Sequence, residues 1–378
     1  MPLPHLRPLA KRAFRHMPRV WTRGLDAYQQ RRHGGARAPA QLDVMTAIGG
    51  NNLDVLQVML LSLSDSHPGD HVRFWLFHLH LGPEKLAELA RFCDTLPNLE
   101  LRLVHVTDSR GFMQLSELGG RPFGARFLWL VAHQHLPGDL RRVLFLDPLD
   151  ILVTDDLLPF LNQPLLGRLV AACRESPYSP PLIAGPAQQA HGRGTSNDRI
   201  LRISKGIVNS GAMVINLDRA RRDGLSIQTY LEVATWAREK LDLSFGDQGL
   251  FSLTHGSDYV QAHDRYNFRF HEATRRDTAL RPAVVHFAGK VAKPFHLRLT
   301  AGQEEMVLAH LKATGTEKVQ LNPFQSIKAF DLAHYRLWWE TCARTPVHAR
   351  IAPTAGEFAT RVLAEQGLGD QRHAPAAQ

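Results

Sequence analysis

Residues 141–153 read Arg-Arg-Val-Leu-Phe-Leu-Asp-Pro-Leu-Asp-Ile-Leu-Val, two apolar runs separated by two acids. The run from Val143 to Leu146 is typical of a strand that is buried on both faces of a sheet. Acids directly after such a strand lie at the carboxyl edge, where open α/β sheets bind ligands. Asp147 and Asp150 would repel each other there unless a cation lies between them, and a divalent cation that carries a diphosphate fits. The alternative is a turn in which both acids only cap and contact solvent.

Strand and helix patterns alternate on both sides of this stretch. Apolar runs at 44–48, 72–79 and 101–106 predict strands, and helical spacing at 53–63, 83–93 and 126–135 predicts the helices between them. This alternation indicates an α/β fold with a mostly parallel sheet and right-handed crossovers. Further strands are predicted at 169–173, 207–217 and 284–287, and a helix at 227–240. Residues 176–205 predict a long loop over the site or a lid.

The domain organisation follows from composition and pattern. We expect a basic, flexible arm over residues 1–40, an α/β domain over 41–300 and a helical extension over 301–378. Helical patterns at 304–312, 332–342 and 358–364 support the extension. In the arm, Pro18 is expected to prevent one long helix.

The positive charge of the chain is concentrated in the arm. Residues 1–40 carry nine Lys and Arg side chains and one acid, Asp26, so this segment holds +8 of the net charge of +9. A nucleic-acid-binding protein carries its charge on the folded body, and this body is almost neutral, so nucleic-acid binding is excluded. A basic segment with Phe14 and Trp21 fits either a disordered arm or a peripheral contact with an anionic membrane.

Three cysteines, Cys93, Cys173 and Cys342, are too few and too widely spaced for a disulfide framework or a zinc ribbon. No apolar run approaches the length of a membrane span, and the N-terminus lacks the apolar centre of a secretory signal. These features predict a cytoplasmic protein, with peripheral contact at the inner face of the membrane as the arm's alternative.

Four segments between residues 41 and 300 carry a recognisable set of polar residues and glycines. They are Met45–Asn52; Arg126 with Leu146-Asp147 and Asp150; Asn209-Ser210-Gly211 with Ile215-Asn216-Leu217 and Asp247-Gln248; and His286-x-x-Gly289-x-x-x-Lys293-Pro294-Phe295. In this order they resemble glycosyltransferase family 8, the galactosyltransferase and glycogenin group. The resemblance implies a Rossmann-like GT-A fold that binds a nucleotide-sugar with Mn²⁺, or Mg²⁺ in its place, and transfers the sugar with retention of configuration.

The resemblance also implies roles for individual residues. The implied metal ligands are Asp147, Asp150 and His286. The implied donor-binding residues are Asn51, Arg126, Gly211, Gly289 and Lys293. The implied residues around the transferred sugar are Asn209, Asp247, Gln248 and Glu175, the last standing where the family usually has Asp. A hard cation prefers carboxylate oxygens and tolerates one imidazole if it is manganese. Gln248 is a poor nucleophile, so attack on the same face as the leaving phosphate is favoured over a covalent intermediate.

The sequence departs from the family pattern at several positions. Pro148 and Leu149 separate the acids, where the family has one residue, so either the added residue is looped out or one acid leaves the site. Gly49 and Asn52 stand where the family has the acid and the aromatic that hold the base. The remaining departures are Gly124 for a tyrosine, Gly249 for an acid and Phe295 for a tryptophan. The fold is expected to survive all of them.

The sequence thus favours a retaining transferase that moves a hexose from a UDP-sugar to a saccharide acceptor. By family habit, the acceptor would belong to cell-surface polysaccharide or lipooligosaccharide synthesis. One alternative is a non-catalytic relative that binds a saccharide or a partner through a degenerate metal site. Another is a transferase with a different nucleotide donor or without metal.

Overall fold

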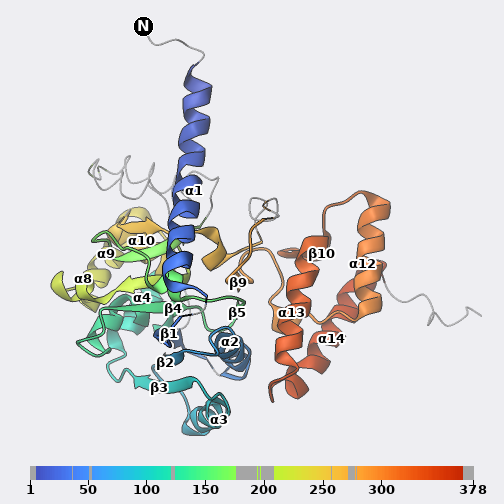
Figure 1. Ribbon diagram of the computed structural model, residues 1–378, viewed down its shortest axis with the longest axis horizontal. Helices are drawn as coiled ribbons and strands as arrows, with labels where there is room; N and C mark the ends of the chain where they lie inside the picture. The colour runs from blue at the N-terminus through green and yellow to red at the C-terminus, as the bar shows by residue number, and fades with distance from the viewer. Residues whose placement is uncertain are drawn as a thin grey trace, which may run out of the picture.

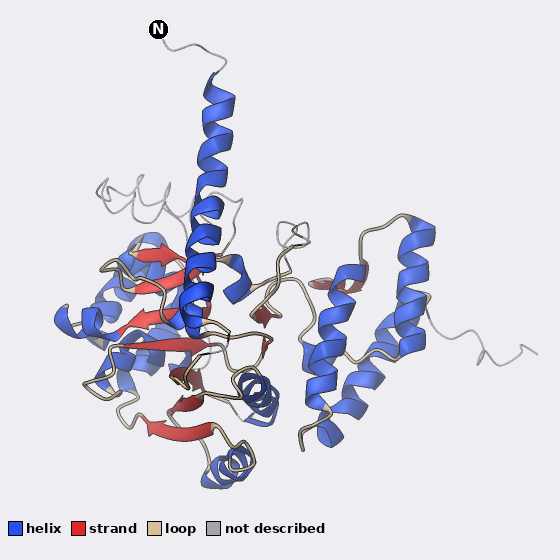
Figure 2. Cartoon of the chain, in the orientation of Figure 1, coloured by secondary structure: helices blue, strands red, loops and turns tan. Residues whose placement is uncertain are grey.

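The computed structural model describes residues 6–35, 37–50, 53–120, 124–175, 208–256, 258–270 and 279–368, and the single residues 194, 196 and 277. Side chains are described from Val20 onward. Asn51 and most of the predicted lid at 176–205 lie outside the described residues. A sheet with helices on both sides forms one part of the molecule, and a helical part lies beside it (Figures 1 and 2).

The central sheet has seven strands in the order β3-β2-β1-β4-β7-β6-β8 (Figure 1). Their bounds are β1 Gln41–Ile48, β2 His71–His78, β3 Leu99–His105, β4 Arg142–Leu146, β6 Val170–Arg174, β7 Val208–Asn216 and β8 Tyr259–Gln261. Four of the six strand pairs are parallel, and β7 pairs antiparallel with both β4 and β6. The α/β class with a mixed, mostly parallel sheet, which the sequence predicts, is confirmed.

Both faces of the sheet are buried, as the uninterrupted apolar strands require. In β1, Leu42 and Val44 pack on one face with the helices α2 and α3, whereas Met45 and Ala47 pack on the other with α4, α9 and α10. The helices of this region are α2 Leu53–Asp65, α3 Pro83–Cys93, α4 Arg110–Gly119, the 3₁₀ segment η1 Gly124–Gln134, α5 Leu158–Leu161, α8 Leu217–Arg222, α9 Ile227–Leu241 and α10 Asp247–His255. The apolar pattern of the sequence did not indicate α4 or α8, and it predicted an ordinary helix where the 3₁₀ segment η1 lies.

The second apolar run of residues 141–153 leaves the central sheet. It forms β5, Ile151–Val153, which pairs antiparallel with β9, Val284–His286, in a separate two-stranded ladder. The short segment η2, Asp264–Asn267, contacts β9. This second ladder lies between the central sheet and the C-terminal part of the chain.

The C-terminal extension is helical except for one hairpin. It contains η3 Pro294–His296, α12 Ala301–Thr314, β10 Val319–Asn322, β11 Gln325–Ile327, η4 Ala329–Asp331, α13 Leu332–Cys342 and α14 His348–Glu365. Its core includes the buried Trp338, which belongs to the same apolar cluster as Val55 and Val58 of α2 and Leu152 of β5. The extension is therefore packed onto the α/β domain through α2 and the second ladder.

The expectation that Pro18 prevents one long helix is wrong. A single helix, α1, runs from Leu6 to His33 and extends beyond the rest of the described chain in Figure 1. Proline inside a helix removes one backbone hydrogen bond at a cost of about 3 kcal/mol. Contacts of the C-terminal half of α1 with the domain help to offset this cost: Thr22 and Gln29 are buried, and Gln30 donates a hydrogen bond to the Tyr266 hydroxyl at 3.1 Å. Among the described residues, no helix combines the length and the apolar character needed to span a bilayer.

Candidate functional site

Asp147 and Asp150 lie at the junction of two β-ladders. Asp147 directly follows β4, and its backbone N–H donates to the carbonyl of Gly211 in β7 at 2.9 Å. Asp150 directly precedes β5, and its carbonyl accepts from Phe287 N–H at 2.8 Å. Pro148 and Leu149 thus span the step from one ladder to the other. The register of the second ladder sets His286 opposite Ile151, next to Asp150.

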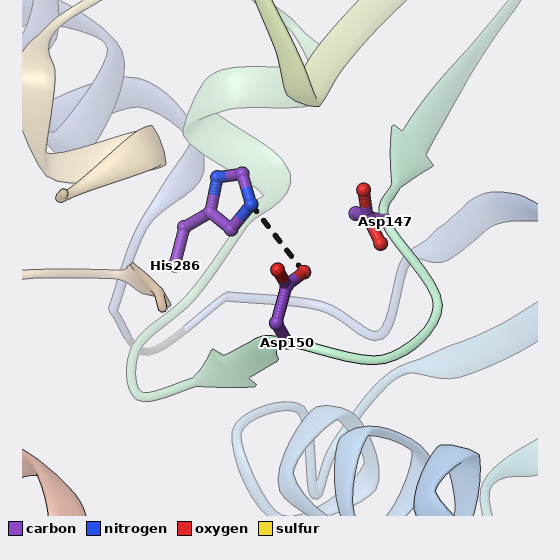
Figure 3. A group of neighbouring side chains, drawn as sticks. All are labelled: Asp147, Asp150 and His286. Atoms are coloured by element: carbon purple, nitrogen blue, oxygen red, sulfur yellow. Dashed lines mark ion pairs between the residues drawn. The ribbon is translucent and has the colours of Figure 1, made fainter. Parts of the chain in front are cut away.

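These elements bring the three predicted metal ligands together. One ligand atom from each of Asp147, Asp150 and His286 lies within 4.8 Å of the others. Figure 3 shows the imidazole of His286 facing the carboxylate of Asp150, with Asp147 at the end of the neighbouring strand. The sequence left open whether the added residue between the two acids is looped out or one acid leaves the site. In the structure the added residue is looped out, and both acids stay at the site.

A chain of hydrogen bonds fixes which nitrogen of His286 faces the acids. The backbone N–H of Gly211 can only donate, and it lies 3.0 Å from Oδ1 of Asn209. The group of Asn267 that lies 2.8 Å from this oxygen must therefore be its NH₂. Oδ1 of Asn267 then lies 2.9 Å from Nδ1 of His286, so Nδ1 carries the proton. In the neutral ring, Nε2 keeps its lone pair and points it toward Asp150.

This arrangement fits a divalent cation. Nε2 of His286 lies 3.4 Å from Oδ1 of Asp150, and this buried oxygen receives no hydrogen bond. Two electron-pair donors that face each other across such a gap are satisfied by a cation between them. The second oxygen of Asp150 accepts from the ammonium of Lys293, which also donates to the Phe287 carbonyl at 3.0 Å. Lys293 thereby supplies part of the positive charge that the acids require.

The two acids have opposite electrostatic environments. Burial and the neighbouring charge of Asp150 raise the pKa of Asp147 well above its ordinary value. Burial alone would also raise the pKa of Asp150, but the charge of His286 when its ring is protonated and the ammonium of Lys293 outweigh it and hold this pKa below its ordinary value. Asp150 is thus the carboxylate that stays ionised, and Asp147 needs further positive charge to do so.

A second cluster adjoins the metal ligands through Asn209. The carboxylate of Glu175 accepts hydrogen bonds from the amide of Asn209 at 2.5 Å and from the amide of Gln248 at 3.1 Å. Arg269, which is 3% exposed, lies 3.1 Å from the same carboxylate and also donates to the carbonyls of Arg174 and Glu175. The side-chain oxygen of Gln248 in turn accepts from Ser210 N–H at 3.2 Å.

A pocket of about 310 Å³ opens beside Asp147. Its walls come from the carboxyl ends of the parallel strands β1 and β4 and from β7, η1 and α10. Its lining includes Gly49, Gly50, Arg126, Asp147, Ser210 and Asp247. Nε of Arg126 is buried without a hydrogen-bond partner, and Nε1 of Trp129 holds Asp247 by a hydrogen bond to Oδ2 at 2.9 Å. Among the described residues, the pocket therefore offers the cationic side chain of Arg126 and the acids Asp147 and Asp247.

Comparison with known proteins agrees with this geometry. Residues 53–297 match the profile of Glycosyl transferase family 8, which is about two thirds of the chain. The chain belongs to this family. Among proteins with curated descriptions, none matches the sequence.

Solved structures of glycosyltransferases are similar to this chain in fold. An active-site mutant of LgtC matches with a TM-score of 0.53 and 22% identity, over 72% of this chain and 96% of LgtC. The bifunctional glycosyltransferase WbbM matches with a TM-score of 0.53 and 16% identity, over 84% of this chain and 52% of WbbM. A complex of the galactosyltransferase LgtC with donor and acceptor sugar analogs matches with a TM-score of 0.49 and 22% identity, over 68% of this chain and 90% of LgtC. The protein is a glycosyltransferase with a GT-A fold.

Most of the residues that the family 8 resemblance singles out lie around this site. Gly211 is there because nothing larger fits: a Cβ at this position would overlap the imidazole of His286. Gly289 lies in the loop that returns Lys293 to Asp150 and has a φ of 91°, which favours glycine. Asn51 lies outside the described residues. The irregular acid spacing, which was one reason to consider a degenerate metal site, does not separate the acids.

Two residues of the site were missed from the sequence, Asn267 and Arg269. They alternate with Phe268 and Phe270, which are buried in the apolar cluster shared with the C-terminal extension. Alternation of polar and apolar residues is the pattern of an extended segment with two different faces. That pattern was the available signal, and it places both polar side chains on the face toward the site.

Proposed function

We propose that this glycosyltransferase transfers a hexose from a UDP-sugar to a saccharide acceptor with retention of configuration. The observation that carries the proposal is the convergence of Asp147, Asp150 and His286 beside a pocket at the carboxyl ends of β1 and β4. A nucleotide-sugar needs a cation for its diphosphate and an adjacent space for its sugar and base. As the acceptor class we propose a cell-surface polysaccharide or lipooligosaccharide, following the habit of the family.

We assign the cation site to Asp147, Asp150 and Nε2 of His286, and we favour Mn²⁺ over Mg²⁺ because one ligand is an imidazole. A cation there would stabilise the negative charge that develops on the departing diphosphate. Lys293 and Arg126 would bind phosphate oxygens, since the first is 35% exposed beside Asp150 and the second has an unpartnered Nε. The loop at Gly289 would let the backbone approach the same group.

The cluster around Glu175 would bind the transferred sugar. Its carboxylate already accepts hydrogen bonds from Asn209, Gln248 and Arg269, which lowers its strength as a nucleophile. Gln248 has an uncharged amide and cannot serve as a nucleophile either. We therefore favour attack on the same face as the leaving phosphate, with Asp247 and Asn209 orienting the sugar.

The base and the compartment complete the proposal. Gly49, which stands at one of the two positions where the family has a base-holding side chain, lines the pocket with Gly50 at the end of β1, so we propose that the uracil lies against the backbone there. We place the protein in the cytoplasm, since its three cysteines are buried free thiols, as is usual in a reducing compartment.

The test is a thermal-shift and donor-hydrolysis screen of nucleotide-sugars, with and without Mn²⁺. We expect one UDP-sugar to raise the melting temperature only with the metal, and to be hydrolysed slowly. The variants Asp147→Asn, Asp150→Asn and His286→Ala should each lose about 100-fold in hydrolysis or more. The surface variant Asp218→Asn should match the wild type. A metal-independent shift, or hydrolysis that survives His286→Ala, would contradict the assignment.

A further inference from the structure

From Val20 onward, where its side chains are described, the helix α1 docks on the domain with a polar face and leaves apolar side chains exposed. In the sequence, apolar residues recur every three or four positions: Leu6, Leu9, Ala13, Met17, Val20 and Trp21, with Tyr28 two turns after Trp21. A surface helix of a globular protein normally turns such a stripe toward the core. In α1, Val20, Trp21 and Tyr28 are instead 70%, 61% and 52% exposed.

Polar contacts fix this orientation. Thr22 and Gln29, which are seven residues and therefore about two turns apart, are 5% and 3% exposed. Asp26 lies on a different face of the helix from Trp21 and Tyr28, and it accepts a hydrogen bond from the Tyr266 hydroxyl. Arg23 forms an ion pair with Asp277. Turning the apolar stripe inward would break these contacts, so its exposure belongs to the folded state.

The charge of the segment indicates what covers the stripe. Residues 1–40 carry eight of the nine net positive charges of the chain, and the remaining residues are almost neutral. A helix with an exposed Trp and Tyr on one face and many arginines around it has the composition of interfacial helices that bind anionic lipids. Tryptophan and tyrosine favour the level of the lipid headgroups, and each basic residue adds attraction to an anionic surface.

We propose that α1 binds the surface of an anionic membrane through the stripe that contains Val20, Trp21 and Tyr28. The helix attaches the α/β domain to the bilayer through its lipid-facing side, while its polar side holds the domain. This inference rests on the exposure and charge of α1 and does not depend on the proposed donor or metal.

The test is co-sedimentation of the full chain with vesicles. The wild type should sediment with vesicles of phosphatidylglycerol and phosphatidylcholine, and it should stay in the supernatant with vesicles of pure phosphatidylcholine. The triple variant Val20→Ser, Trp21→Ser, Tyr28→Ser should lose about tenfold in partition coefficient or more, because it removes the apolar contact and leaves every arginine. Phe324→Ser, at a still more exposed apolar residue (79%) in the turn between β10 and β11, is the control and should bind like the wild type. Unchanged thermal unfolding of both variants shows that they fold.

Two further measurements separate lipid binding from its rivals. Raising the salt concentration from about 0.1 to about 0.5 M should release the wild type from the anionic vesicles, because screening weakens attraction to the headgroups. Equal pelleting of the wild type and the triple variant would overturn the proposal. It would also be overturned if the wild type ignored both kinds of vesicle but formed a dimer in sedimentation velocity that the triple variant lost, because the stripe would then bind a second copy of the chain.

Discussion

Oδ1 of Asn267 lies 2.9 Å from Nδ1 of His286, and the amide of the same Asn267 donates to Oδ1 of Asn209 at 2.8 Å. The backbone N–H of Gly211 can only donate, so Oδ1 of Asn209 must accept. This fixes the direction of every hydrogen bond in the chain from Gly211 to His286. The end of the series is an imidazole that carries its proton on the side away from the acids. A histidine that binds a metal through Nε2 requires this tautomer.

The substitution Asn267→Ala should weaken Mn²⁺ binding about 10- to 100-fold, because it frees the ring of His286 and removes the acceptor for Nδ1. Isothermal titration with Mn²⁺ in the presence of UDP measures the loss. Asn322→Ala, in the hairpin of the C-terminal extension, is the control and should bind like the wild type. An Asn267→Ala variant with unchanged Mn²⁺ affinity would show that the tautomer of His286 is set by something else.

The contact between Gly211 and His286 leads to a second prediction. Gly211→Ala should reduce donor turnover about 100-fold, because the added methyl overlaps the imidazole and displaces it by a distance that such sites do not tolerate. It should also lower the free energy of unfolding by about 1–3 kcal/mol through overpacking. Steady-state donor hydrolysis and thermal unfolding measure the two effects. Gly302→Ala in α12, where no atom lies within 4 Å of the new methyl, should leave turnover unchanged.

Much of the site could be predicted because its residues end or begin strands. The run Val143–Leu146 ends at Asp147, and Asp150 starts the next run, so the carboxyl edge follows from apolar pattern alone. The pairing of β5 with β9, which brings His286 to Asp150, joins residues more than 130 positions apart and leaves no local signal. Only the resemblance to glycosyltransferase family 8 indicated that His286 and Asp150 belong to one site. Asn267 and Arg269 were missed because their alternation with Phe268 and Phe270 covers only four residues and lies outside the predicted strands and helices.

The position of Lys293 gives a third prediction. Its ammonium is bound to Asp150, so it competes with a free cation for the same carboxylate, yet it is also the side chain placed to bind a diphosphate. Lys293→Met should therefore raise the affinity for Mn²⁺ alone about 3-fold or more, and lower the affinity for UDP with Mn²⁺ about tenfold. Titrations with each ligand in turn measure both changes. Lys290→Met, at an exposed lysine of the same loop, should change neither. If Lys293→Met weakened Mn²⁺ binding as well, competition for Asp150 would be wrong.

The N-terminal segment shows where sequence reasoning failed and why. A proline and a high density of charge predict an arm without a long helix, because local propensity is all that the sequence displays there. The structure shows tertiary contacts instead: Tyr266, some 240 residues away, accepts a hydrogen bond from Gln30 and donates one to Asp26. A second anchor follows the helix: Arg37 pairs with Asp70, 33 positions away and directly before the second strand.

This anchor gives the last prediction. Arg37 donates to the two oxygens of Asp70 at 2.5 and 2.6 Å, and Ala40 N–H donates at 3.0 Å. Burial alone would raise the pKa of Asp70, but these hydrogen bonds outweigh it and hold the pKa below its ordinary value. Stability from a lowered pKa is present above the unfolded-state value, about pH 4, and is lost as the pH falls through the folded-state value.

Asp70→Asn should therefore lower the free energy of unfolding by about 2 kcal/mol at neutral pH. The difference from the wild type should shrink as the pH falls below about 4, because the wild-type carboxyl is then protonated too. Urea unfolding across this range measures it. Asp108→Asn, which breaks an ion pair with Arg110 in which both side chains are exposed, should show no measurable change at any pH. A loss in Asp70→Asn that stayed constant down to the acid limit would mean that the carboxyl contributes packing and not charge, since only the charge of Asp70 titrates in this range.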